Sequence, residues 1–149
     1  MNLSLRRATI EDARDVLRWR NDPATRENSF NKAEIDLNSH LAWFEKKLAQ
    51  KNCLMFIMMD DDKKVGNIRL DVTDGVGEIS YMIAPEYRGK GYGKKMLILL
   101  EAKLNDIESD VKTLTAFVLK DNVASMRCFL DNGYTGEDAG DSFCYSKML

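Results

Sequence analysis

Residues 78–93 read Glu78-Ile79-Ser80-Tyr81-Met82-Ile83-Ala84-Pro85-Glu86-Tyr87-Arg88-Gly89-Lys90-Gly91-Tyr92-Gly93, and this stretch decides the fold. Its first half has the composition of a β-strand, which ends at Pro85 because proline cannot donate a hydrogen bond to the sheet. The three glycines let the chain turn sharply and approach a ligand closely. The helix that follows points unpaired N–H groups and its positive dipole end at the same place. The stretch therefore predicts a strand, an anion-binding loop for phosphate or pyrophosphate, and a helix.

The charge of this loop is opposite to that of the chain. Arg88, Lys90 and Lys94 are basic, whereas the whole sequence has a formal net charge of −2. A Walker loop is not supported, because Gly93 is followed by two lysines rather than by Lys and Ser or Thr. A dinucleotide-binding fold places its glycines early in the chain, and here they come late. Taken alone, the glycines are equally consistent with a tight turn between strand and helix.

Working outward from this loop, hydrophobic periodicity predicts the remaining elements. Strands are expected over residues 3–7, 54–59, 65–72, 77–84, 113–119 and 143–148, with a further short strand at Tyr134. Helices are expected after the capping box Thr9 to Asp12, from Asp36 or Asn38 to about Asn52, after the glycine loop, and from Val123 to Leu130. The resulting order, β-α-α-β-β-β-α-β-α-β-β, indicates an α+β fold. We expect residues 1–149 to form one domain, because no linker or repeat divides them.

Composition excludes several classes of protein. A net charge of −2 gives no positive field for a nucleic-acid backbone or an anionic membrane. The chain has no apolar run long enough to span a membrane and no signal-peptide core at its start, so we expect it to be cytoplasmic. Cys53, Cys128 and Cys144 form no CxxC pair, and the single histidine completes no zinc site, so we expect free thiols and no metal.

Two motifs carry a resemblance to a known family. The segment from Pro85 through the following helix resembles motif A of the GNAT superfamily of N-acetyltransferases, [QR]-x-x-G-x-[GA], with matches at Arg88, Gly89, Gly91 and Gly93. Residues 122–129, followed by Asn132-Gly133-Tyr134, resemble the second signature of that family. The resemblance spans nearly the whole chain. It implies a GNAT fold, with a mixed sheet of about seven strands splayed between the fourth and fifth and flanked by about four helices.

The resemblance also implies acetyl-coenzyme A (acetyl-CoA) as co-substrate. Its pantetheine arm would occupy a slot between residues 81–84 and 116–119, pairing with the main chain of Met82, Ile83 and Ala84. The pyrophosphate would be held by the amides of Arg88, Gly89, Lys90, Gly91, Tyr92 and Gly93. Asn122, Ser125 and Phe129 would complete the cofactor site, and a main-chain N–H near Met82 or Ile83 would stabilise the oxyanion.

The acceptor amine must lose a proton before it attacks, because an alkylammonium group has no lone pair. Glu78 is the candidate base: it begins the splayed strand and shares a face with Ser80 and Met82. The alternative is an ordinary exposed carboxylate at a strand end. Many GNAT enzymes have a tyrosine acid where this chain has Phe129, so Tyr134, Ser125 and Cys128 are the alternatives for that role.

The acceptor is predicted only from resemblance. Residues 19–23, 39–44 and 65–70 resemble enzymes that acetylate nucleotide-linked amino sugars, nearest the 4-amino-sugar N-acetyltransferases of pseudaminic-acid pathways. The Trp-Arg-Asn start and the His-x-x-Trp-Phe pattern also resemble N-terminal acetyltransferases of ribosomal proteins. The candidate substrate-binding residues are Arg20, His40, Trp43, Asn67, Arg69 and Ser80.

Further expectations concern how an acceptor would be recognised. Trp43 and Phe44 are candidates for stacking on a ring, and Arg26 is a further candidate partner for a diphosphate. A nucleotide sugar predicts a basic or aromatic cleft, whereas a peptide predicts an acidic one. A third reading is a non-catalytic acetyl-CoA sensor. The chain is expected to be a monomer or a homodimer.

Overall fold

The computed structural model describes residues 1–149 and contains one seven-stranded sheet in the order β1-β2-β3-β4-β5-β7-β6. The strands are β1 (Leu3–Arg7), β2 (Cys53–Asp60), β3 (Lys63–Thr73), β4 (Val76–Ile83), β5 (Thr113–Leu119), β6 (Thr135–Asp138) and β7 (Ser142–Met148). All neighbours are antiparallel except β4 and β5, which are parallel. The predicted mixed sheet and α+β class are confirmed.

The helices are α1 (Ala13–Asn21), α2 (Pro23–Glu27), α3 (Leu37–Ala49), α4 (Tyr92–Asp106) and α5 (Val123–Asp131), with 3-10 turns at Ile10–Asp12 and Pro85–Tyr87. Helix α2 was not predicted from the sequence. Asp22 and Pro23 do end α1, but the Asp22 carboxylate also accepts hydrogen bonds from the amides of Ala24 and Thr25 and so caps a new helix. The polar stretch expected there therefore begins with a short helical turn.

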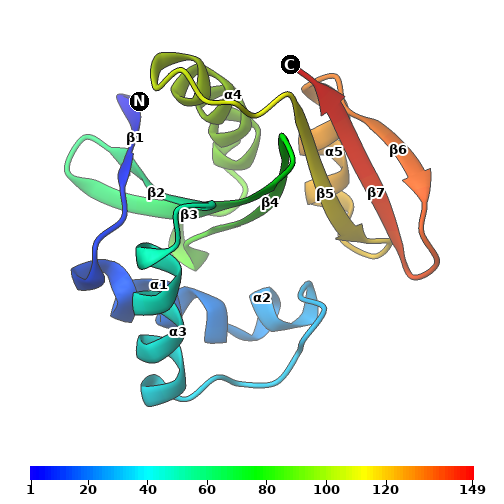
Figure 1. Cartoon of the computed structure of the whole chain (residues 1–149). Coiled ribbons are helices and arrows are strands. Elements are labelled where there is room, and N and C mark those ends of the chain that lie inside the picture. The colour runs from blue at the N-terminus through cyan, green and yellow to red at the C-terminus, as the bar shows by residue number, and fades with distance from the viewer.

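The sheet separates two hydrophobic cores (Figure 1). Helix α4 covers one face of β2 to β4, and α1 and α3 cover the other. Along β2, Phe56 and Met58 belong to the core beneath α4, while Met55 and Ile57 belong to the core beneath α1 and α3. This alternation confirms that the continuous apolar run of residues 54–59 is a strand buried on both faces.

Strands β4 and β5 diverge soon after they meet (Figure 1). Their ladder consists of only three pairs, and the last joins Glu78 to Thr115. Beyond it, β4 continues to pair with β3 as far as Ile83, and β5 continues to pair with β7 as far as Leu119. The sheet is thus split between β4 and β5, and the candidate functional site lies at this split.

A buried ion-pair network ties β1 to the start of α1. The Asp12 carboxylate is almost fully buried and accepts hydrogen bonds from Arg6 at 2.8 and 2.9 Å and from the Thr9 amide at 2.8 Å. The Lys64 ammonium lies 2.7 Å from the same carboxylate. Burial alone would raise the pKa of Asp12, but the hydrogen bonds from Arg6, Lys64 and Thr9 together hold it well below its ordinary value.

This network gives a prediction about stability. Asp12→Asn should lower the free energy of unfolding at pH 7 by about 2–4 kcal/mol, a value reduced by solvent screening of the part-exposed Arg6 and Lys64. A depressed folded pKa stabilises the protein above the unfolded pKa and loses that effect as the pH falls below about 4. Urea unfolding at pH 7 and pH 3 should therefore show a smaller difference between wild type and variant at pH 3. Asp15→Asn, which removes a more exposed carboxylate bound to the same lysine, is the control and should cost under about 1 kcal/mol. Equal losses in the two variants would contradict this account.

Candidate functional site

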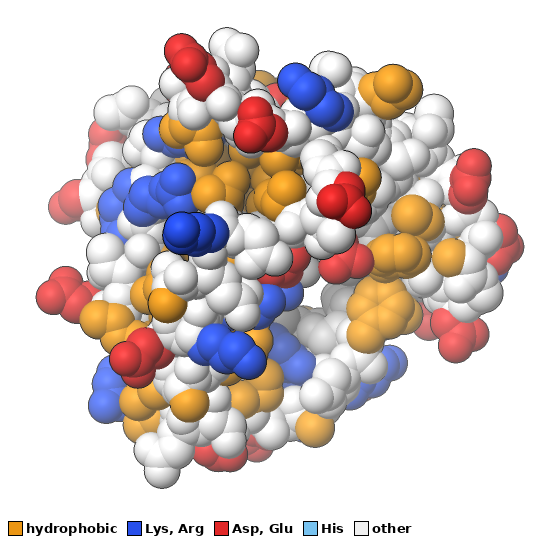
Figure 2. Space-filling view, in the orientation of Figure 1, with side chains coloured by type: hydrophobic (Ala, Val, Ile, Leu, Met, Phe, Trp, Pro, Cys, Tyr) orange, Lys and Arg blue, Asp and Glu red, His pale blue; other side chains and the backbone are white.

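Two cavities open into the split between β4 and β5. One is about 700 Å³ and lies toward α1 and α3, and the other is about 560 Å³ and lies toward the glycine loop. The residues that line both cavities come from α2 and the segment after it, from β4, and from the start of α5: Thr25, Asn28, Ser29, Tyr81, Met82, Asn122 and Ser125. The two cavities therefore meet, and Figure 2 shows the surface hollowed here, with basic side chains along one wall.

The second cavity ends at the glycine loop. Gly89 and Gly91 have φ values of 75° and 82°, and a side chain added at either position would meet open space. Gly91 is the N-cap of α4, and no side chain caps this end of the helix. The first amide N–H groups of a fifteen-residue helix thus face an open concavity, which is the arrangement that binds anions.

Between this loop and the first cavity runs an unpaired edge of backbone. After Glu78, β4 has no strand on its β5 side, so alternate N–H and C=O groups of residues 79–83 have no strand partner there. An extended ligand with amide groups can pair with such an edge as an added strand would. An anion cradle continuous with an open strand edge fits a long ligand with a diphosphate and an amide-containing arm.

A model of the acetyltransferase (GNAT) domain matches residues 2–135. The chain belongs to the GNAT acetyltransferase family. Acetyltransferase PseH of Campylobacter jejuni subsp. jejuni serotype O:2 is 27% identical over 133 residues, which make up 87% of this chain and 81% of that one. Among solved structures, aminoglycoside acetyltransferase AAC(6')-Ib in complex with coenzyme A has a TM-score of 0.82 at 20% identity, covering 99% and 95% of the two chains. Spermidine N-acetyltransferase from Vibrio cholerae has a TM-score of 0.83 at 16% identity, with the same coverage.

The protein is thus a GNAT acetyltransferase that uses acetyl-CoA. When bound, acetyl-CoA supplies an acetyl group activated as a thioester. The glycine cradle and the open edge of β4 fit its diphosphate and pantetheine arm. No group of three or more His, Cys, Asp or Glu side chains is arranged to hold a metal ion, and no helix is both long and apolar enough to cross a membrane.

The residues predicted to bind the cofactor fall into three groups in this acetyltransferase, according to the cavity that they line. Those that line the second cavity are Met82, Ile83, Arg88, Gly89, Gly91, Tyr92, Gly93, Asn122 and Ser125. Phe129 lines only the first cavity, and Ala84 and Lys90 line neither, so the cofactor role of these three residues stays a prediction. The Ala84 amide already donates to the Val65 carbonyl, and its carbonyl accepts from the Tyr87 amide, so the Ala84 N–H is not available to pantetheine. The Lys90 ammonium lies 5.7 Å from the centre of the exposed face of Tyr87.

Several cofactor-side residues also hold the site together. The Arg88 guanidinium donates to the Asp22 carboxylate at 2.9 Å and to the Thr25 hydroxyl, which links the glycine loop to α2. The Tyr92 hydroxyl donates to Asp60 at 2.7 Å, so its ring anchors the start of α4 to β2. The Asn122 side chain accepts from the Ser125 amide and caps α5.

The candidate base lies at the split itself. Glu78 is the last β4 residue paired with β5, is exposed, and lines the first cavity. Alternation along the strand gives it the same face as Ser80, which lines that cavity too. A carboxylate at this point faces the space in which an acceptor amine would approach the thioester.

The residues considered for the general acid differ in burial and in the cavity that they line. Phe129 is buried and stacks on Tyr145 with 5.5 Å between ring centres. Tyr134 packs edge-on against Phe129, lines neither cavity, and has a buried hydroxyl without a partner, so it is a core residue. Cys128 lines only the second cavity, and burial raises the pKa of its thiol. Of the alternatives considered from the sequence, only Ser125 lies where the cavities meet.

All the predicted substrate-binding residues line the first cavity: Arg20, His40, Trp43, Asn67, Arg69 and Ser80. His40 is buried, and its Nε2 donates to the Ala13 carbonyl at 2.8 Å. Because burial lowers the pKa of His40, the ring is neutral at neutral pH. Asn67 likewise donates to the Phe56 carbonyl at 3.2 Å. Both residues shape the cavity wall.

The two arginines of this cavity differ in how their charge is compensated. Arg69 donates to Asp71 at 2.9 Å and to Ser80 at 3.2 Å, and its guanidinium lies 4.9 Å from the centre of the Trp43 ring. Arg20 forms no ion pair with any carboxylate: its Nη2 donates to the Asn31 carbonyl, and its buried Nη1 has no hydrogen-bond partner. Arg26, the third candidate, donates to the Lys32 carbonyl and does not line the cavity. Arg20 therefore places a positive charge without a carboxylate partner in the wall of the first cavity.

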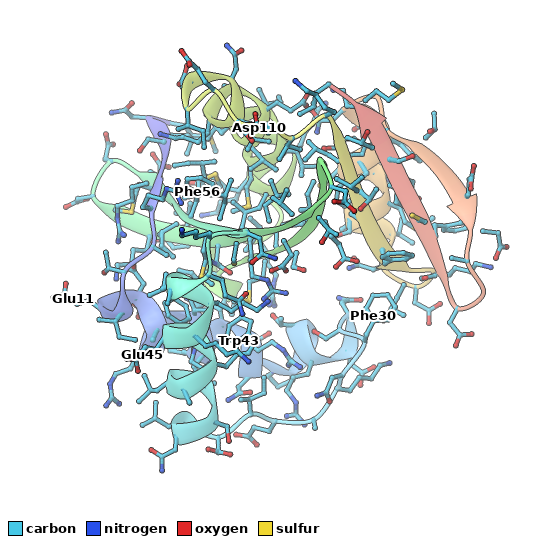
Figure 3. The ribbon with its side chains drawn as sticks, in the orientation of Figure 1. Glu11, Phe30, Trp43, Glu45, Phe56 and Asp110 are labelled. Atoms are coloured by element: carbon cyan, nitrogen blue, oxygen red, sulfur yellow. The ribbon has the colours of Figure 1, made fainter.

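Sequence reasoning missed two aromatic residues. Phe30 and Phe117 line the first cavity and are 62% and 47% exposed, whereas Phe44, a stacking candidate, is fully buried in the core. Figure 3 shows Phe30 on the segment between α2 and α3, across the hollow from Trp43 on α3. Phe30 sits in a polar stretch without periodicity, so no pattern marked it. Phe117 lies within residues 116–119, which were predicted to border the pantetheine slot, but it was not named as a contact residue.

The glycine loop provides a direct test of cofactor binding. Gly91→Ala places a β-carbon on a left-handed backbone, which costs about 1–2 kcal/mol and distorts the cradle, so the affinity for acetyl-CoA should fall about tenfold or more. Gly140→Ala is a matched control, because Gly140 also has a positive φ and open space around it but lies outside both cavities. Isothermal titration with acetyl-CoA should show weakened binding only for Gly91→Ala. An equal effect of the two changes would contradict the cradle.

Proposed function

We propose that this acetyltransferase, acting as a single domain of residues 1–149, acetylates the amino group of a nucleotide-linked amino sugar. The observation that carries the proposal is the uncompensated guanidinium of Arg20 in the first cavity. Arg20 is half-buried and its Nη2 donates to the Asn31 carbonyl, but no carboxylate neutralises its charge, so an anionic group on the acceptor would be favourable there. The diphosphate of a nucleotide sugar is such a group, and arginine binds phosphate oxygens through two parallel hydrogen bonds.

The apolar lining supports the same class of acceptor. Phe30, Trp43 and Phe117 are the exposed aromatic residues among the large hydrophobic side chains, and all three line the first cavity. Exposed aromatic faces gathered in one cavity favour a ligand with rings, such as a nucleobase or a sugar. The likeness to Acetyltransferase PseH and the subgroup resemblance of the sequence agree with this choice.

The lining gives less support to a peptide acceptor. Glu78 is the one acidic residue among those that line the first cavity, alongside Arg20 and Arg69. A protein N-terminus carries a positive charge near neutral pH and favours an acidic groove. The cavity is instead basic and aromatic, which is the property expected for a nucleotide sugar.

The site residues then take distinct roles in the transfer. Glu78, directly or through a water molecule, removes a proton from the acceptor ammonium, because only the free amine has the lone pair that attacks the thioester. A main-chain N–H near Met82 donates to the oxyanion that forms on the acetyl carbonyl. Arg20 holds the anionic part of the acceptor, and the aromatic wall orients its rings.

A panel assay tests the proposal. Release of free thiol from acetyl-CoA should be measured with UDP-linked amino sugars, the same amino sugars without the nucleotide, polyamines, and N-terminal peptides. We expect turnover with a nucleotide-linked amino sugar and little with the others. Turnover restricted to peptides would replace the proposal with protein N-terminal acetylation, and binding of acetyl-CoA without turnover of any amine would favour a sensor.

A further inference from the structure

The side chains at the junction of the two cavities include a closely bonded pair of hydroxyls. Tyr81 on β4 and Ser125 on α5 are 44 residues apart in sequence, and their hydroxyl oxygens are 2.6 Å apart. Both residues line both cavities. The reactive thioester must lie where the cofactor cavity meets the acceptor cavity, so this pair borders the place where the C–S bond breaks.

One of the two hydroxyl hydrogens is not used by the hydrogen bond within the pair. Each hydroxyl carries one hydrogen, and a single bond between the two oxygens consumes one of them. A phenol is a better donor than an aliphatic hydroxyl, which favours Tyr81 as donor and Ser125 as acceptor. The hydrogen of Ser125 is then free to point into the split.

The packing around the pair holds both groups in place. The Tyr81 ring lies edge-on to Phe129 at 5.9 Å between centres, and it approaches Gly93, where a β-carbon would lie 3.4 Å from the ring. The Ser125 amide is fixed by the cap from Asn122. Burial raises the pKa of Tyr81 strongly, so its hydroxyl stays protonated and acts as a hydrogen-bond donor at every working pH.

The other hydroxyls at the junction belong to Thr25 and Ser29, on α2 and the segment after it. Ser29 donates to the Thr25 carbonyl at 2.6 Å, and the Thr25 hydroxyl accepts from Arg88. Phe129 offers no donor. On the wall formed by β4 and α5, Tyr81 and Ser125 therefore supply the side-chain hydroxyls of this junction.

We propose that Ser125 donates a hydrogen bond to the sulfur of coenzyme A as it leaves, and that Tyr81 is the positioning residue that holds Ser125 for this task. As the tetrahedral intermediate collapses, the C–S bond breaks and its electron pair moves to sulfur, where the Ser125 hydrogen bond stabilises the thiolate. Overall, the amine loses one proton and the thiol gains one through solvent, so no other reactant is needed. The pair takes over the part that a tyrosine at position 129 would play.

The test uses coenzyme A itself and does not depend on the acceptor. The pKa of the thiol of enzyme-bound coenzyme A, labelled with carbon-13 at the carbon next to sulfur, should be measured by NMR titration, in which the protein cysteines give no signal. A donor to the thiolate lowers that pKa, so Ser125→Ala should raise it by about one unit relative to wild type. Tyr81→Phe should raise it less, and the double variant should match Ser125→Ala, because the two groups act in series.

Two further measurements keep the result specific. Binding of desulfo-coenzyme A should be unchanged in each variant, which shows that the slot is intact. Cys128→Ala, which removes the competing candidate for the acid beside Tyr81, should leave the pKa of the bound thiol unchanged. A pKa in Ser125→Ala equal to that of wild type, with desulfo-coenzyme A still bound, would overturn the inference and leave the proposed acceptor untouched.

Discussion

Glu78→Gln should lower kcat/KM for acetyl transfer by about 10³-fold, because general base catalysis contributes about 10²- to 10⁴-fold to such reactions. Glutamine has nearly the same shape as glutamate but cannot accept the proton of the acceptor ammonium. Glu78 is exposed and forms no ion pair, so its replacement should leave the fold unchanged. Stopped assays of acetylated product, with titration of acetyl-CoA binding beside them, measure both effects. The affinity for acetyl-CoA should change by less than about twofold, because Glu78 lines only the acceptor cavity.

The rate of the Glu78→Gln variant should recover as the pH approaches the pKa of the acceptor amine, because an amine that is already neutral needs no base. Glu137→Gln is the matched control: Glu137 is an exposed carboxylate on β6 that lines neither cavity. It should retain the wild-type rate at every pH. A Glu78→Gln enzyme as active as this control would show that another group removes the proton.

Much of the architecture could be predicted because its signals are local. Pro85 ends β4, the glycines permit the left-handed turns before α4, and the continuous apolar run of residues 54–59 suits a strand buried on both faces. The six candidate substrate-binding residues also line one cavity, and their contact with an acceptor stays a prediction. These features depend on backbone chemistry and on motif spacing, both of which are visible along the chain.

The features that could not be predicted depend on contacts between distant residues. Nothing near Ser125 in sequence points to Tyr81, and nothing near Arg88 points to Asp22, because the sheet and α2 bring each pair together. Ala84 follows the strand motif, but its amide and carbonyl are used by Val65 and Tyr87. Motif position therefore marks the segment that binds a ligand, and tertiary hydrogen bonding decides which of its groups are free.

Substitution of Arg20 is the most direct test of the proposed acceptor. The charge of this arginine could be read from the sequence, but the absence of a carboxylate partner is a property of the fold. Burial, together with the nearby charge of Arg26, lowers the pKa of Arg20, which is the sign of a cation that the folded protein does not favour. A positive charge that lacks a carboxylate partner costs stability, and an anionic group on a ligand would offset that cost.

Arg20→Met should therefore raise KM for a nucleotide-linked amino sugar by about 100-fold, because it removes a charge-assisted contact to the diphosphate. It should lower the free energy of unfolding by no more than about 1 kcal/mol, because half-buried Arg20 forms no ion pair and loses only its hydrogen bond to the Asn31 carbonyl. Steady-state kinetics and urea unfolding measure the two effects. Arg26→Met removes a neighbouring arginine outside the cavity and should leave KM unchanged. A destabilised Arg20→Met protein with an unchanged KM would make Arg20 a structural residue, whereas a raised KM in a protein of full stability would support a direct contact between Arg20 and the acceptor.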